Sequence, residues 1–362
     1  MTYTLQQQAF TISVLSNNVA GQKGDVATLE SDLVTSVNQA LTNPAFTKYI
    51  GTWKLVWGPV IWQDTTAKPP STRADNVMMA AQDTSGNIVV GIAGTNPNSA
   101  FDRGIEDLDV GTTVPFPGSE SPSWLSFGAS QGIAKLEAMT DASGDTLAAF
   151  LQKNASTTAT LVIAGHSLGG ALAPAFAIDL LVNQGVAQSS FANVFVYATA
   201  GPTGGNQDFV NLFTSMFPAQ GSTPATAWNQ VIVNQSDAVP RAWNDIGSLP
   251  TLYPEINNGN APKCIGFLLT DVLQPALNGN TNYAPIPSVT FNFGYNESIT
   301  PPLRGVTCQW LAQAIWQHIP AYFVEIVNEL SQGNLLQSPI LPGDACAFID
   351  AWCDKHRVGT ND

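Results

Sequence analysis

The first part of the chain has the spacing of amphipathic helices. Within about residues 1–50, apolar side chains recur every three to four positions, as at Leu29, Leu33, Val37 and Leu41. No polar cluster in this stretch suggests chemistry. We therefore expect a helical layer here that packs on the rest of the protein.

Short apolar runs follow and predict strands. The first is 55–62, and two more, 77–81 and 88–92, are joined by a turn rich in Asp, Ser, Gly and Asn that is typical of a hairpin. From about residue 160 onward, strand-like and helix-like runs alternate, which is the pattern of parallel strands joined by crossover helices. The predicted fold class is therefore α/β, with a mixed sheet that starts antiparallel and becomes mostly parallel.

The second half of the chain places polar residues directly after predicted strands. This is the edge of an open α/β sheet at which functional sites form. Residues 245–300 are rich in Pro, Gly and Asn, and helical patterns resume at 303–316 and 321–330. Because no long linker is present, we expect one domain over 1–362, with an insertion or cap at about 245–300.

One strand-like run ends in a pentapeptide of the form Gly-Xaa-Ser-Xaa-Gly. Its residues are Gly165, Ser167 and Gly169, and a small-residue helical pattern follows at once. A sharp turn from strand to helix exposes the serine, and glycines on either side leave room for that turn. The start of the helix directs free N–H groups at a reacting oxygen. The motif predicts that Ser167 is a catalytic nucleophile; an ordinary Gly-rich turn is the alternative.

A serine nucleophile needs a base, and the chain contains 3 histidines. His166 precedes Ser167, where neighbouring side chains point in different directions, so we expect it to pack against the scaffold. His356 lies near the C-terminus between two basic residues, as in a solvated charged tail. His318 ends a helical run before an Ile-Pro pair, where the chain breaks. His318 is therefore the predicted base, and a core histidine between two helices is the alternative.

The acid that orients the base should follow a strand, between the serine and the histidine in the chain. Asp237 meets this condition because it follows the run 231–233, and a Val-Pro pair stiffens the loop behind it. The other carboxylates of the region end no clear strand: Asp245, Glu255 and Asp271. We predict that Asp237 holds the imidazole of His318, against the alternative of a surface turn carboxylate.

Composition limits the partners of the protein. The chain has 362 residues, of which 44% are hydrophobic, so it can bury a sizeable core. A net charge of −14 argues against binding nucleic acid or an anionic membrane by electrostatics. Polar residues interrupt the hydrophobic stretch 160–182, so we expect buried core there. The residues after Met1 lack the basic start and the apolar run of a signal peptide. The mature form of a secreted protein would lack them too, so the localisation stays open.

Four cysteines lie in the last hundred residues: Cys264, Cys308, Cys346 and Cys353. If they are oxidised, three pairings are allowed, and free thiols are the alternative. In a helix Cys346 and Cys353 would lie roughly 10.5 Å apart along the axis, too far to bond each other. No Cys-Xaa-Xaa-Cys motif or nearby histidine cluster exists, so we expect no metal site.

Together these motifs resemble the fungal-type triacylglycerol lipases (class 3 lipases) and their bacterial relatives. The resemblance rests on four segments, 165–170, 201–209, 234–240 and 317–323, and covers about residues 75–330. It implies an α/β-hydrolase fold, in which a mixed, mostly parallel sheet is covered by helices on both faces.

The resemblance also implies roles for two residues next to the serine turn. In this family an oxyanion-hole Ser or Thr follows a Gly after the hairpin, and Thr95 stands after Gly94 in that position. A simple turn is the alternative for Thr95. The N–H of Leu168, directly after Ser167, would be the second donor to the oxyanion.

The family also has a lid helix, which residues 99–110 resemble. Phe101, Ile105 and Leu108 form one apolar stripe in this stretch. A permanently docked surface helix is the alternative, and a cover formed by 246–269 is another.

These residues predict a carboxylic ester hydrolase, a lipase or esterase that acts on acylglycerols or similar lipid esters through an acyl-enzyme and needs no cofactor. The expected partners are a lipid or small ester substrate and a lipid–water interface. A phospholipase or a polyester or feruloyl esterase would share every named residue. A lipid-binding protein without activity is the alternative from another class. The first 50 residues and the long stretch between Asp237 and His318 depart from the fungal members, so substrate preference does not carry over.

Overall fold

The computed structural model describes residues 2–96, 110–118, 122–267, 269, 282–299 and 305–332. Its helices are α1 (Leu5–Leu15), α2 (Val26–Thr42), α3 (Pro44–Ile50), α4 (Phe127–Ala138), α5 (Leu147–Asn154), α6 (Leu168–Val182), α7 (Gln207–Met216), α8 (Lys263–Phe267), α10 (Gly305–His318) and α11 (Pro320–Gln332). Its strands are β1 (Trp53–Trp62), β2 (Asn76–Asp83), β3 (Ile88–Ile92), β4 (Thr113–Pro115), β5 (Trp124–Ser126), β6 (Thr160–His166), β7 (Asn193–Thr199), β8 (Gln230–Asn234) and β9 (Ser288–Phe291).

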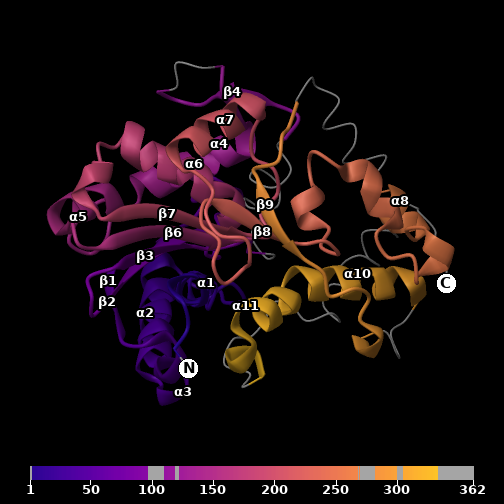
Figure 1. Ribbon diagram of the computed structural model, residues 1–362, viewed down its shortest axis with the longest axis horizontal. Coiled ribbons are helices and arrows are strands. Elements are labelled where there is room, and N and C mark those ends of the chain that lie inside the picture. Colours follow the sequence, from indigo (N-terminus) through magenta and orange to yellow (C-terminus); the bar gives the residue numbers. More distant parts are fainter. Residues whose placement is uncertain are drawn as a thin grey trace.

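A mixed sheet forms the centre of the protein (Figure 1). Among the described residues it has seven strands in the order β1-β2-β3-β6-β7-β8-β9. Strands β1 to β3 are antiparallel, with Ala80 opposite Val90 in the predicted hairpin, and the neighbours from β3 to β9 are parallel. Because parallel strands end at the same edge of a sheet, the turn after β6 and the loop after β8 come close together.

Helices cover both faces of this sheet and bury a separate hydrophobic core on each. Helices α4 to α7 lie on one face, and α1, α2, α3 and α11 lie on the other (Figure 1). Ile88 and Val90 of β3 belong to the first core and Val89 to the second, because successive side chains of a strand point to opposite faces. A strand buried on both faces is a continuous apolar run, which explains the sequence pattern. The predicted fold class is confirmed.

The stretch 245–300 contributes to the sheet as well as to a separate cluster. Strand β9 lies within it and pairs in parallel with β8, with Ile232 opposite Val289. This strand, which has 4 residues and lies at the edge of the sheet, was not predicted from the sequence. Side chains from 246–269 pack with Trp310 of α10 into a third hydrophobic cluster. This part of the stretch is therefore packed on α10.

Two of the four cysteines lie in the described part of the chain. Cys264 and Cys308 are both disulfide-bonded, so the free-thiol alternative is wrong for these two. Cys346, Cys353 and His356 lie outside the described residues.

The lid predicted at 99–110 lies outside the described residues from 99 to 109, and so do Phe101, Ile105 and Leu108. Val110, the last residue of this stretch, is buried, and its carbonyl accepts a hydrogen bond from the Tyr283 hydroxyl at 2.7 Å. Among the helices that the structure describes, none has the length and hydropathy needed to cross a membrane.

Two carboxyl groups meet where α4 packs on α6. Asp179 of α6 is buried and accepts hydrogen bonds from the side chains of Asn183 and Gln184. Burial, and then the neighbouring Asp179, raise the pKa of Glu137 on α4 from 4.5 to about 7. A carboxyl whose pKa is higher in the folded state stabilises the fold below its unfolded pKa. That contribution is lost as pH rises through about 7.

We therefore expect the free energy of unfolding to fall between about pH 5 and about pH 8.5. Glu137→Gln should remove about 1 kcal/mol of this fall, since solvent screens the partly exposed Glu137 carboxyl. Urea unfolding at both pH values measures it. Glu255→Gln, at an exposed carboxyl, is the control and should leave the pH dependence unchanged. An equal fall in wild type and Glu137→Gln would contradict the expectation.

Candidate active site

Ser167 occupies a strained turn between β6 and α6. Its φ is 61° and its ψ is −126°, a region that residues other than glycine rarely adopt. A Cβ atom on Gly165 would collide with the backbone of Gly169, and one on Gly169 would collide with the carbonyl of Ile92. Glycine at both positions is therefore required for this turn.

Three side chains from distant segments form a chain of hydrogen bonds. Ser167 Oγ lies 2.9 Å from His318 Nε2, and His318 Nδ1 lies 2.9 Å from Asp237 Oδ2. Because a carboxylate accepts hydrogen bonds, the proton of the neutral imidazole is on Nδ1, and Nε2 presents its lone pair to the serine hydroxyl. An imidazole in this position can take the proton of the hydroxyl. The structure thus brings together the three residues that the sequence predicted.

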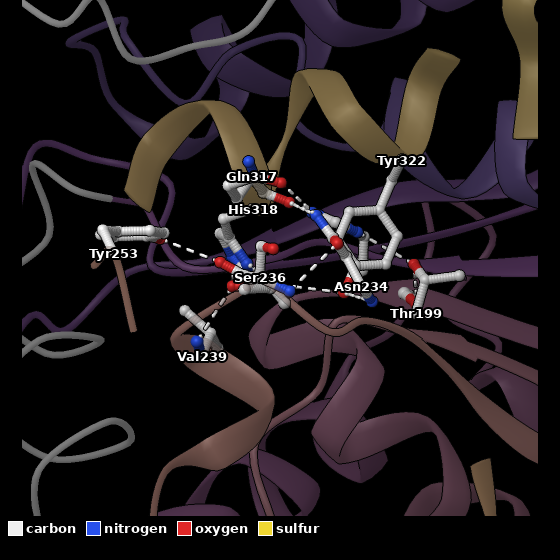
Figure 2. Close-up of polar contacts among 12 residues, drawn as sticks. Thr199, Asn234, Ser236, Val239, Tyr253, Gln317, His318 and Tyr322 are labelled. Carbon is white, nitrogen blue, oxygen red and sulfur yellow. Dashed lines mark hydrogen bonds and ion pairs between the residues drawn. The ribbon is translucent and has the colours of Figure 1, made fainter. Parts of the chain in front are cut away.

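The side chain of Asp237 is completely buried, with an exposed fraction of 0%. Besides His318, Oδ2 accepts a hydrogen bond from the Tyr322 hydroxyl at 2.9 Å, and Oδ1 accepts one from the Val239 N–H at 3.0 Å (Figure 2). A buried carboxylate is costly unless hydrogen-bonded donors surround it, and these three groups supply them. Burial, and then the charge of Asp237, raise the pKa of the Tyr322 hydroxyl well above its ordinary value, so it remains a donor.

A second set of contacts joins the end of β8 to the end of α10. Asn234 Nδ2 donates to the backbone carbonyl of Gln317 at 2.9 Å and to its Oε1 at 2.6 Å, and the N–H of Asn234 donates to the Tyr322 hydroxyl at 2.9 Å (Figure 2). The last carbonyls of a helix have no partner within it, and Asn234 supplies one here. Both amide side chains are fully buried. Asn234 therefore holds the helix end that carries His318.

Sequence reasoning did not assign roles to Tyr322, Gln317 or Asn234. They lie in segments that resemble the class 3 lipases, but the sequence predicts no individual role for them. The available signal was spacing: Tyr322 follows His318 by four residues, and Asn234 ends the strand before Asp237. These side chains meet because β8 lies close to α10 and α11 in the folded protein.

The two residues expected to form an oxyanion hole lie next to the serine turn. A Cβ atom on Gly94 would lie 2.8 Å from the carbonyl oxygen of His166 and 3.2 Å from the Cβ of Ser167. The chain after β3 therefore runs against this turn, which places the half-buried Thr95 beside it. Leu168 is the first residue of α6, and such an N–H has no carbonyl partner one turn earlier in the helix.

We expect Tyr322→Phe to lower kcat about 10-fold and to cost about 1–2 kcal/mol of stability. The variant removes one donor from the buried Asp237 carboxylate and leaves the N–H of Asn234 without its acceptor. Ester hydrolysis and urea unfolding measure the two effects.

Tyr253→Phe is the matched control for this variant. The Tyr253 hydroxyl is also held by a backbone group of the loop, donating to the Ser236 carbonyl at 2.9 Å, but it does not bond the carboxylate (Figure 2). It should lose a similar amount of stability and keep its kcat. Equal kcat values in the two variants would show that the Tyr322 hydroxyl does not act on Asp237.

Comparison with known proteins adds a family match over part of the chain and a similar fold. Residues 112–246 match the family described as lipase (class 3). The chain is similar to the crystal structure of M37 lipase, with a TM-score of 0.70 and 25% identity over 91% of this chain and 93% of that chain. Lipase II from Rhizopus niveus has a TM-score of 0.42 and 17% identity over 66% of this chain and 75% of that chain. No curated protein is a significant match to the sequence.

Proposed function

We propose that this relative of the class 3 lipases is a serine hydrolase that cleaves acylglycerols or similar lipid esters. The family resemblance read from the motifs is confirmed, and the fold is that of the α/β-hydrolases. Family and fold support the reaction class, ester hydrolysis by a lipase-type enzyme. The observation that carries the finer proposal is the unbroken chain of hydrogen bonds from Ser167 through His318 to Asp237.

The proposed reaction has two steps. Ser167 Oγ attacks the ester carbonyl carbon while its proton passes to His318 Nε2, and the imidazolium then protonates the leaving alcohol as the C–O bond breaks. In the second step water attacks the acyl-serine, His318 takes a proton from the water, and the carboxylic acid leaves as Ser167 regains its proton. The carboxylate of Asp237 holds the imidazole ring and stabilises its charged form.

Negative charge develops on the carbonyl oxygen in both steps. We assign its stabilisation to the N–H of Leu168, at the start of α6, and to the N–H and hydroxyl of Thr95. The helix dipole of α6 adds to this effect, since the N-terminal end of a helix favours negative charge.

The lipid substrate would be reached by apolar contact. With a net charge of −14, attraction to anionic head groups is absent. Phe293 is a large hydrophobic side chain that is 38% exposed, and its ring lies 5.6 Å from that of Trp316, two residues before His318. Phe293 is thus one exposed apolar side chain packed against α10, the helix that ends at His318.

Covalent labelling tests the proposed nucleophile. A fluorophosphonate should label wild type at Ser167 and should not label Ser167→Ala, and peptide mass spectrometry locates the label. Absence of labelling in folded wild type would favour a lipid-binding protein without activity.

A substrate panel tests the substrate class. Hydrolysis of a p-nitrophenyl ester chain-length series should be compared with that of emulsified triglyceride and phospholipid. We expect cleavage of the triglyceride at a higher rate than the phospholipid. The reverse order would identify a phospholipase, and cleavage of only soluble short esters would identify an esterase.

A further inference from the structure

His166, the residue before Ser167, is buried and lies against the proposed catalytic base. The centroids of the His166 and His318 rings are 5.0 Å apart, with the ring planes at 33°. The Tyr322 ring packs edge-on against His166 at 5.1 Å, and the Phe10 ring lies 6.1 Å away on α1. The sequence predicted packing against the scaffold, but the surface that His166 contacts includes the base itself.

The His166 ring is fixed in position by Thr199 of β7. Its Nδ1 lies 2.9 Å from Thr199 Oγ1, and that hydroxyl donates to the carbonyl of Gly165 at 3.3 Å. The hydroxyl therefore accepts from His166, which places the ring proton on Nδ1. The backbone carbonyl of Thr199 also accepts from the N–H of Ser167 at 3.0 Å. One threonine thus holds both the serine turn and the ring of His166, the last residue of β6.

The second ring nitrogen of His166 has a different environment. Nε2 is buried and makes no hydrogen bond. Burial, and then the neighbouring His318, lower the pKa of His166 well below its ordinary value, while the backbone of His318 acts in the opposite direction. The ring is therefore uncharged at neutral pH. This matters because a charged ring at this distance would repel the imidazolium that forms on His318 during catalysis.

We propose that His166 is a positioning residue for His318: its ring, fixed by Thr199, is the surface against which the base is aligned. Hydrogen bonds to Asp237 and Ser167 hold the two nitrogens of His318, but neither stops the ring from tilting about the line between them. Contact with the face of His166 restricts that tilt. The proposal rests on the proposed function, in which a small displacement of the base lowers the rate of catalysis strongly.

Two substitutions at position 166 separate the ring from its hydrogen bond. His166→Phe keeps an aromatic ring among apolar neighbours and loses the contact to Thr199. His166→Asn keeps a donor for Thr199 Oγ1 and loses the ring. If the ring aligns His318, His166→Asn should lower kcat by about 10- to 100-fold and His166→Phe by less than about 10-fold, with KM changed less than about 2-fold in both. The reverse order would overturn the proposal.

Thr199→Val tests the same chain of contacts from the other end. It should lower kcat about 3- to 10-fold in the wild type and have little further effect in His166→Asn, because it acts through the ring. Full additivity would contradict this. Tyr197→Phe is the control: it removes a buried hydrogen bond to the Pro224 carbonyl from the same strand and should keep kcat.

All rates are measured with p-nitrophenyl butyrate and divided by the fraction of sites that a fluorophosphonate labels, so that unfolded protein does not count. The downfield proton resonance of His318 Nδ1–H reports the alignment directly, and it should broaden in His166→Asn and persist in His166→Phe. Wild-type kcat per labelled site in His166→Asn would overturn the inference about His166 alone. Wild type that is neither labelled nor active would overturn the proposed function instead.

Discussion

Replacing Ser167 or His318 by alanine should lower kcat by roughly 10⁴- to 10⁶-fold without unfolding the protein, because the members of a catalytic triad act as a unit. Ser167→Ala removes the nucleophile. The backbone strain at this position stays, because a φ of 61° is as unfavourable for alanine as for serine. His318→Ala leaves the hydroxyl without a base at 2.9 Å. Hydrolysis of a p-nitrophenyl ester, with circular dichroism to verify folding, measures the loss.

The double variant Ser167→Ala/His318→Ala distinguishes a triad from independent contributions. It should be about as inactive as either single variant, because removing one member already disables the other. His356→Ala is the matched control, since its position in the sequence predicts a solvated tail, and it should keep full activity. Activity retained in His318→Ala and lost in His356→Ala would show that the base is assigned wrongly.

Thr95→Val should lower kcat about 100-fold and change KM little. The hydroxyl would donate to charge that develops only in the transition state, so its removal affects the rate more than substrate binding. Steady-state kinetics on the same p-nitrophenyl ester separate the two constants. Valine keeps the shape and branching of threonine, so the comparison isolates the hydroxyl.

Thr95→Ser is the control for this position, because serine retains the donor and loses only the methyl group. It should recover most of the kcat that valine loses. A change confined to KM in Thr95→Val would mean that Thr95 lines the substrate pocket and does not stabilise the oxyanion.

The sequence by itself determined the serine turn and the mixed character of the sheet near it. Gly165 and Gly169 report a local requirement, because only glycine fits where two backbone segments approach so closely. The runs that became β3 and β6 are apolar throughout because both faces of these strands are buried. Such features depend on nearby residues and can be predicted from the sequence.

His318 and Asp237 were likewise chosen as candidates from the sequence alone. With 3 histidines in the chain, the break before Pro320 distinguished one of them. Asp237 was distinguished by its place after a strand, since parallel strands present their ends at one edge of the sheet. Their distances to each other follow from the fold, but their identities did not require it.

Only the tertiary structure decided which side chains support these residues. Tyr322 and Asn234 contact the site because α11 and β8 meet there, and no periodicity in the sequence records that meeting. Strand β9 joins the sheet through pairing with β8, although its 4 residues are too few to stand out as a strand in a stretch rich in Pro, Gly and Asn. His166 was predicted to pack, but the ring it packs against comes from more than 150 residues away. Turns and buried strands depend on local sterics and burial, so the sequence predicts them well. Contacts between distant segments depend on how whole helices and strands pack, so the sequence predicts them poorly.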